Sequence, residues 1–114
     1  MVIAIDFDGT IVEHKYPKLG KEIPLAVQTL KQLQQDGHKL ILWTVRNGKE
    51  LDEALEFCSK RGLEFYAINS SYPDEIYDSQ YLSRKIVADL YIDDRNYGGL
   101  LPWEEIYSKI SKHK

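Results

Sequence analysis

Short apolar runs alternate with longer amphipathic segments along this chain of 114 residues, and this alternation is the feature that most constrains its fold. The apolar runs are rich in Ile, Val and Leu and predict strands buried on both faces. These predicted strands are Val2–Phe7, Lys39–Thr44, Phe65–Ile68 and Ala88–Ile92. Apolar residues at helical spacing predict helices between the strands and after the last one. These predicted helices run from Pro24 to Gly37, from Asn47 or Gly48 to Gly62, and from about Pro102.

Strands that alternate with helices predict an α/β domain, because right-handed crossovers place successive strands side by side and parallel. We therefore expect residues 1–114 to form a single doubly wound domain, Rossmann-like, with a mostly parallel sheet. We expect helices on both faces of that sheet, which gives three layers in the order α/β/α. A polar, Tyr-rich segment, Asn69–Arg84, separates the last two predicted strands.

The composition excludes several classes of protein. Hydrophobic residues make up 43% of the chain and charged residues 29%, a balance typical of a globular domain with a real core. The net charge of −3 disfavours nucleic acid as a partner. The single cysteine, Cys58, excludes an internal disulfide, and the scattered His residues show no zinc-type spacing. No apolar run approaches the roughly 20 residues of a membrane span, so we expect a cytoplasmic protein without a membrane partner.

Chemically active side chains follow the predicted strands, at the edge of a parallel sheet where ligands bind. They are Asp6 and Asp8, Thr44, and Asp93 with Asp94, while Lys85 shortly precedes the last strand. Four carboxylates brought together repel one another, and one ammonium group does not balance them. An all-oxygen set of ligands favours Mg²⁺ as the balancing cation.

Each of these residues, taken alone, also has a simpler interpretation. Asp8 and Gly9 form a common turn pair, and the Asp residues after the last strand could close it through Asx turns. Thr44 could cap a helix, and Lys85 could be a solvated charge. Turn chemistry does not explain why a carboxylate pair, a hydroxyl, a Lys and a second carboxylate pair all fall at strand ends. The combination therefore favours a site.

Phosphoryl transfer fits this set of groups. Asp6 would attack phosphorus in line and form an aspartyl-phosphate. Asp8 would protonate the leaving oxygen and then activate the water that hydrolyses the intermediate. Thr44, Lys85 and the backbone N–H groups around Gly9 would donate hydrogen bonds to the phosphoryl oxygens.

The chain resembles the haloacid-dehalogenase-like superfamily of aspartate-nucleophile phosphatases. Its four motifs occur in the family's order, over about 90 of the 114 residues. They are Asp6-Phe7-Asp8-Gly9-Thr10, then Thr44 after the KLILW strand, then Lys85, then Asp93-Asp94 after the ADLYI strand. The first and last motifs are the specific ones, whereas Thr44 and Lys85 gain weight from their positions.

The resemblance implies a role for each matching residue. Asp6 would be the nucleophile and Asp8 the acid and base, with Thr44 and Lys85 holding the phosphoryl group. Mg²⁺ would be bound by Asp6, by the backbone carbonyl of Asp8 and by Asp93, with Asp94 as a further ligand or a partner of the ligands. Gly9 and Thr10 of the first motif, and Arg46 just past Thr44, complete the residues expected to contact phosphate or substrate. For Arg46, a solvated loop position is the equally weighted alternative.

The resemblance also implies a capless phosphatase, a phosphomonoester hydrolase whose substrate the sequence does not identify. The segments available for a cap, Ile11–Ile23 and Asn69–Arg84, are too short to fold as domains. Such an open site is expected to act on a phosphorylated small molecule or a macromolecular phosphoester, and a homo-oligomer is one way to shield it. His14 could assist proton transfer or sense pH, with an exposed loop position as the favoured alternative. The segment Arg95-Asn96-Tyr97-Gly98-Gly99 could shape the wall of the site, with a turn marked by its glycines as the alternative.

Two other functions compete with a phosphatase. A receiver-like signalling module also gathers Asp, Thr and Lys around Mg²⁺, but its acidic pair ends the first strand and its phosphorylated Asp lies on a later one. A catalytically idle Mg²⁺-binding interaction module would keep the ligands without the reaction. The complete set of motifs favours the enzyme.

Overall fold

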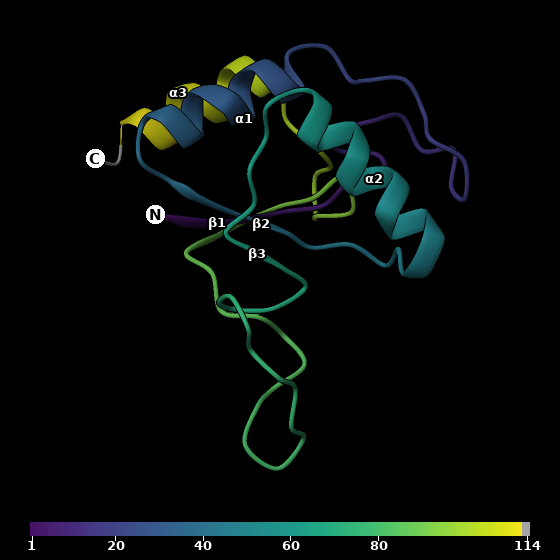
Figure 1. Ribbon diagram of the computed structural model, residues 1–114. Helices are drawn as coiled ribbons and strands as arrows, with labels where there is room; N and C mark the ends of the chain where they lie inside the picture. The colour runs from purple at the N-terminus through teal and green to yellow at the C-terminus, as the bar shows by residue number, and fades with distance from the viewer. Residues whose placement is uncertain (113–114) are drawn as a thin grey trace.

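A four-stranded parallel sheet forms the centre of the computed structural model, which describes residues 1–112 (Figure 1). The strands lie in the order β3-β2-β1-β4, and every neighbouring pair is parallel. Their bounds are Val2–Ile5 for β1, Lys39–Leu42 for β2, Ala67–Ile68 for β3 and Leu90–Ile92 for β4. The α/β class and the parallel sheet predicted from the sequence are confirmed, and each strand is two residues shorter than its apolar run, at one end.

Three helices accompany the strands. They are α1 (Ala26–Gln35), α2 (Gly48–Lys60) and α3 (Trp103–Ser111). Helix α1 begins two residues after Pro24, because Leu25 has a left-handed backbone conformation with φ of 67°. Over residues 1–112, no helix combines the length and the apolar character needed to cross a bilayer.

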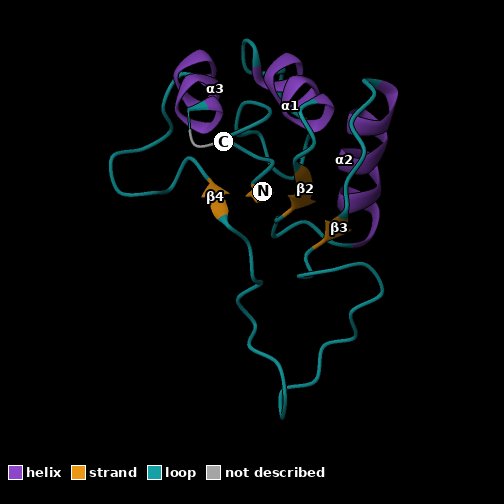
Figure 2. Ribbon diagram, turned by 90° about the vertical axis from the view of Figure 1, so that its left-hand side faces the viewer, coloured by secondary structure: helices purple, strands orange, loops and turns teal. Residues whose placement is uncertain are grey.

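All three helices cover the same face of the sheet (Figure 2). Alternate strand residues on this face are buried or nearly so and pack into one cluster with the helices. The strand members of that cluster are Ile3, Ile5, Leu40, Leu42, Leu90 and Ile92. The opposite face has a smaller cluster around Ala4, Ile41 and Ala67, covered by Ile86 from the segment between β3 and β4.

The prediction of helices on both faces, and hence of three layers, is not confirmed. Strands β1, β2 and β3 are added in one direction, so right-handed crossovers place α1 and α2 on one face. The step from β3 back to β4 reverses direction and crosses the other face. Its connection, residues 69–89, forms no helix, since it contains Pro73 and lacks apolar residues at helical spacing. A loop therefore stands where the third layer was expected.

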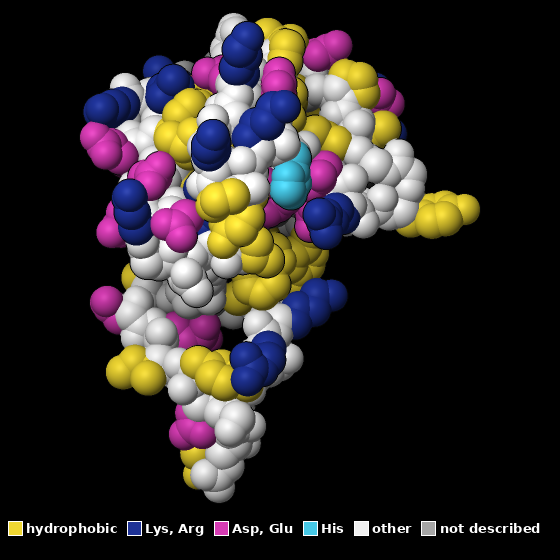
Figure 3. Space-filling view, turned by 90° about the vertical axis from the view of Figure 1, so that its right-hand side faces the viewer, with side chains coloured by type: hydrophobic (Ala, Val, Ile, Leu, Met, Phe, Trp, Pro, Cys, Tyr) yellow, Lys and Arg dark blue, Asp and Glu magenta, His cyan; other side chains and the backbone are white. Residues whose placement is uncertain are grey.

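A hairpin-like segment, residues 13–22, leaves the carboxyl edge of the sheet and returns to it; we call it the flap. Its ends are joined by the Glu13 N–H, which donates to the Lys21 carbonyl at 2.7 Å, and by an antiparallel bridge between Val12 and Glu22. The Ile23 N–H donates to the Ile11 carbonyl at 2.8 Å and continues the pairing. Figure 3 looks onto this carboxyl edge, where Lys and Arg side chains and one His gather beside acidic side chains.

Candidate active site

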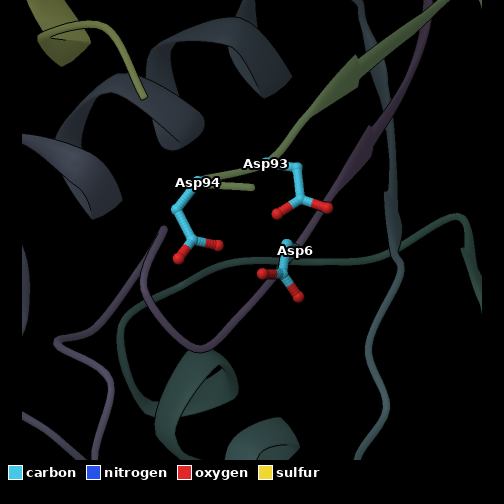
Figure 4. Close-up of side chains that lie close together, drawn as sticks. All are labelled: Asp6, Asp93 and Asp94. Carbon is cyan, nitrogen blue, oxygen red and sulfur yellow. The ribbon is translucent and has the colours of Figure 1, made fainter. Parts of the chain in front are cut away.

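Three carboxylates meet where the order of the strands reverses. Asp6 directly follows β1, and Asp93 and Asp94 directly follow β4, its neighbour on the reversed side. The Asp6 N–H donates to the Ile92 carbonyl at 3.0 Å, which extends the pairing of the two strands to the site. One oxygen from each carboxylate lies within 4.8 Å of the others, and the three side chains lie close together (Figure 4). The sequence predicted that Asp6, Asp93 and Asp94 converge, but the Asp8 carboxylate, predicted as a fourth member, is paired with Arg46 instead.

Asp6 is strongly perturbed by this environment. Burial, followed by the charge of Asp93 and then by a hydrogen bond and charge from Asp94, raises the pKa of Asp6 from 3.8 to about 8. A hydrogen bond from the Phe7 N–H opposes this rise. The three carboxylates therefore carry more negative charge than their own surroundings balance. A divalent cation among oxygen ligands relieves this repulsion.

Asp94 is held by the first motif. Its backbone N–H donates to Thr10 Oγ1 at 3.1 Å, and the Thr10 hydroxyl lies 3.5 Å from the Asp94 carboxylate. Thr10 is completely buried, and the Trp103 ring N–H donates to its carbonyl at 3.1 Å. The expectation that Thr10 contacts substrate does not fit this burial, because its hydroxyl is already used to position Asp94.

Gly9 lies against the same carboxylate. A Cβ at this position would collide with the Asp94 carboxylate, and the φ of Gly9 is +82°. Its N–H donates to the Val12 carbonyl at 2.7 Å, so this donor is not available to a phosphate. Gly9 therefore supplies space and a backbone turn rather than the phosphate contact that the sequence predicted.

Asp8 forms a buried ion pair with Arg46. Arg46 Nε donates to one carboxylate oxygen at 2.8 Å, and Nη2 donates to the other at 2.7 Å. The Asp8 side chain is 6% exposed and the Arg46 side chain 0%. This bond raises the pKa of the Arg46 guanidinium, since it favours the charged form. A two-point pair of this kind fixes the orientation of the Asp8 carboxylate.

The remaining donors of Arg46 are also used. Nη1 donates to the carbonyls of Pro17 and Glu50, each at 3.2 Å, and Nη2 donates to the Lys18 carbonyl at 2.8 Å. A guanidinium has five N–H groups, so none remains for a substrate phosphate. The prediction that Arg46 contacts substrate is therefore replaced by a different role, in which Arg46 joins the first motif, the flap and the first turn of α2.

Thr44 lies at the site, whereas Lys85 lies away from it. The Thr44 hydroxyl oxygen accepts the Arg46 backbone N–H at 3.1 Å, and its own proton is left to donate. Lys85 is exposed on the loop between β3 and β4, with Nζ 5.0 Å from the centre of the Tyr91 ring. That ring contact accounts for the position of the ammonium group in this structure.

Two adjoining hollows open at the carboxylates, and both are lined by Asp6, Asp93 and Val45. The first has a volume of about 320 Å³ and lies under the flap; we call it the flap-side hollow. Its other lining residues are Asp8, His14, Tyr16 and Arg95. The second, of about 250 Å³, is the Thr44-side hollow, and its other lining residues are Trp43, Thr44 and Asn69.

A solved structure of a conserved protein from Bacteroides thetaiotaomicron is 61% identical to this chain. The similarity covers 100% of this chain and 92% of that chain, with a TM-score of 0.92. The two proteins belong to one family. No protein-family model matches the sequence, and no curated protein matches it. The comparison supports the α/β fold, and the activity must be argued from the chemistry of the site.

Sequence reasoning missed four side chains that line the hollows: Tyr16, Trp43, Val45 and Asn69. Asn69 follows β3, and its Oδ1 accepts the Thr44 N–H at 2.8 Å. The rule that polar residues at the carboxyl ends of strands gather at one edge could have found it. Trp43 and Val45 carry no such signal, because apolar residues at the end of a strand are typical of a core.

We predict that Gly9→Ala weakens the carboxylate cluster more than backbone strain alone explains. Gly98→Ala is the matched control, because Gly98 has a φ of +91° and a Cβ added there would have no atom within 4 Å. Positive φ at a non-glycine residue costs about 1–3 kcal/mol, so both variants lose stability in urea unfolding. Only Gly9→Ala should also raise the Mg²⁺ concentration needed for half-maximal thermal stabilisation, by about tenfold. Equal Mg²⁺ requirements in the two variants would contradict the contact with Asp94.

We also predict that the metal-free protein loses stability as pH rises from about 4 to about 8. The folded pKa of Asp6 is raised above 3.8, so its contribution is fully present below pH 3.8 and is lost as pH rises through about 8. Asp6→Asn removes this loss and raises the melting temperature at pH 8.5 by about 5 °C in the presence of a chelator. Asp52→Asn, on the exposed face of α2, serves as the control. A melting temperature of Asp6→Asn that fell with pH as steeply as the parent's would refute this assignment.

Proposed function

We propose that this protein is a Mg²⁺-dependent phosphomonoesterase of the haloacid-dehalogenase-like type that acts through an aspartyl-phosphate on Asp6. The observation that carries the proposal is the meeting of Asp6, Asp93 and Asp94 at the point where strand order reverses, beside the Thr44 hydroxyl. The nucleophile, the cation ligands and the hydroxyl that would donate a hydrogen bond to the phosphoryl group then lie within one open site. The order of the motifs along the chain supports the same conclusion.

The residues present fit a Mg²⁺ ion. Asp6, Asp93 and Asp94 would hold it, since they offer three carboxylate oxygens in one cluster and Mg²⁺ prefers oxygen ligands. The raised pKa of Asp6 is consistent with this assignment, because burial first, and then the charges of Asp93 and Asp94, disfavour its ionised form, and a cation would favour that form. When bound, Mg²⁺ balances the charge of the carboxylates and polarises the phosphoryl oxygens.

The protein's own groups carry the two steps of the proposed reaction. An Asp6 oxygen attacks phosphorus while the ester P–O bond breaks. The leaving oxygen takes a proton that Asp8 must carry in this step, on a lone pair that its contacts with Arg46 do not use. Water then attacks the aspartyl-phosphate, giving its proton to Asp8 and releasing inorganic phosphate and free Asp6. The Thr44 hydroxyl donates to a phosphoryl oxygen in both steps. Lys85 would join them only after leaving the ring of Tyr91.

Arg46 supports the reaction without touching substrate. It holds both Asp8 oxygens and the flap carbonyls of Pro17 and Lys18, so Asp8 keeps one orientation at the wall of the flap-side hollow. Preorganisation of this kind matters because a displaced acid or base costs a large part of the rate. Arg46 is therefore a positioning residue.

The experiment that tests the proposal measures phosphate release from a panel of small phosphomonoesters, with Mg²⁺ and with excess chelator. We expect release that requires Mg²⁺ and stops when the metal is removed. A phosphorylated protein that persists for minutes would instead favour the receiver-like signalling module. Absence of release from the whole panel, and then from macromolecular phosphoesters, would leave an idle Mg²⁺-binding module.

A further inference from the structure

The two hollows at the carboxylates have different lining residues, and this difference decides where the leaving group lies. Asp8, the proposed proton donor, lines the flap-side hollow. Thr44, whose hydroxyl would donate a hydrogen bond to the phosphoryl group, lines the other hollow. A proton donor must lie within hydrogen-bonding reach of the leaving oxygen. The body of the alcohol therefore occupies the flap-side hollow, and the phosphoryl oxygens face Thr44.

The flap-side hollow has a partly apolar wall. The Tyr16 ring is 41% exposed, and its centre lies 5.1 Å from the Arg46 guanidinium carbon, so a buried cation holds the ring in place. Val45 is 83% exposed and lines both hollows. Tyr16 and Val45 line the same hollow, so together they offer a contact surface for an apolar ligand group.

One guanidinium that lines this hollow is not used in an ion pair among the described residues. Arg95 lines it, and within residues 1–112 its guanidinium forms no ion pair. His14, from the flap, lines the same hollow. The acidic residues there are already assigned: Asp8 is paired with Arg46, and Asp6 and Asp93 face the proposed cation. Figure 3 shows Lys and Arg side chains around this edge of the molecule.

We propose that the flap-side hollow selects a small phosphomonoester whose alcohol has an apolar body and a second anionic group, such as a carboxylate. The apolar body would lie against Tyr16 and Val45, and the anion would bind Arg95. A volume of about 320 Å³ suits a small molecule rather than a polymer chain. The inference rests on the proposed phosphatase function and names the substrate class of that site.

The test compares two synthetic substrates, phenyl phosphate and 4-carboxyphenyl phosphate, with saturating Mg²⁺. Their leaving phenols have similar acidity, so a difference in kcat/KM reports mainly on binding of the carboxylate. We expect the carboxylated substrate to be preferred about tenfold, mostly through a lower KM. The preference should disappear in Arg95→Met and remain in part in Arg95→Lys. Lys60→Met, at the exposed far end of α2, is the control and should keep the full preference.

The possible outcomes separate the proposed substrate class from the proposed phosphatase activity. Equal kcat/KM values for the two substrates in the parent protein would overturn the anionic substrate class while leaving the phosphatase in place. A preference that survives in Arg95→Met would overturn the role of Arg95. If neither substrate releases phosphate while another phosphomonoester of the panel does, the substrate class is overturned and the phosphatase stands. If the whole panel and macromolecular phosphoesters are inert as well, while the protein stays folded and binds Mg²⁺, the phosphatase is refuted and the substrate class with it.

Discussion

Asp6→Asn should abolish Mg²⁺-dependent phosphate release, with kcat lowered by at least about 10⁴-fold. The amide keeps the shape of the carboxylate but is a far weaker nucleophile toward phosphorus, so no aspartyl-phosphate forms. The same change removes one of the three carboxylates that would hold the cation. The measurement is single-turnover and steady-state phosphate release from phenyl phosphate. Acid-quenched samples of the parent protein should contain phosphate covalently bound to Asp6, and those of the variant should not.

Asp52→Asn is the matched control for this loss. Asp52 lies on the exposed side of α2, and the change removes the same charge by the same chemistry away from the site. The control should retain the parent rate. Residual Mg²⁺-dependent release in Asp6→Asn within about tenfold of the parent would refute Asp6 as the nucleophile. Lost activity in an Asp6→Asn sample that circular dichroism finds folded under the assay conditions would not be a consequence of unfolding.

Arg46→Met should have the largest effect on stability, lowering the free energy of unfolding by about 3–5 kcal/mol. Removing the guanidinium leaves the buried Asp8 carboxylate without its partner, and it removes the Arg46 donors from the flap carbonyls of Pro17 and Lys18. A small domain has a total stability of about 5–15 kcal/mol, so the variant should be near the limit of folding. The measurement is urea unfolding monitored by circular dichroism.

Two further variants keep this prediction testable if Arg46→Met does not fold. Arg46→Lys keeps the positive charge but loses the planar group with five N–H donors, so its free energy of unfolding should lie between those of the parent and of Arg46→Met. Arg46→Met combined with Asp8→Asn should lose about 0.5–3 kcal/mol less than the sum of the single changes, because the two side chains interact. Arg84→Met, at an exposed loop position, should change stability by less than about 0.5 kcal/mol. If the stability lost in the double variant equals the sum of the losses in the two single variants, Asp8 and Arg46 contribute no interaction energy to folding.

An activity readout separates the positioning role of Arg46 from its structural role. In folded Arg46→Lys, we expect kcat to fall more than KM rises, since Asp8 acts on the reacting bond rather than on initial binding. A loss confined to thermal stability, with unchanged kcat, would mean that Arg46 serves the fold alone. The comparison is made below the unfolding transition of the variant, so that the folded fraction is equal in all samples.

Much of the fold was predictable because it follows from local patterns. The apolar runs that form β1 and β2 match these strands to within two residues at each end, and α2 begins at Gly48 as its sequence indicated. The missing third layer was predictable only in part. The absence of a helix in residues 69–89 follows from local features, Pro73 and the lack of helical periodicity, whereas the path of this segment across the second face depends on the order of the strands.

The candidate site, like the fold, was predictable from the sequence only in part. The convergence of Asp6, Asp93 and Asp94 follows from one rule, that parallel strands place their carboxyl ends at one edge of the sheet. The role of Arg46 does not follow from any such rule. An Arg two residues after a predicted strand is typical of a solvated or substrate-binding group, and only its burial and its hydrogen bonds show otherwise.

The sequence alone determined which chemical groups this protein brings to the carboxyl edge of its sheet, because their positions relative to the strands are local properties of the chain. Tertiary structure decided which of those groups are free to meet a ligand. Asp6, Thr44 and Arg95 remain at the hollows, whereas Thr10 is turned to Asp94 and Arg46 to Asp8. The physical reason is that a side chain's partners are set by distant segments packed against it, and those contacts have no signature in the residues beside it.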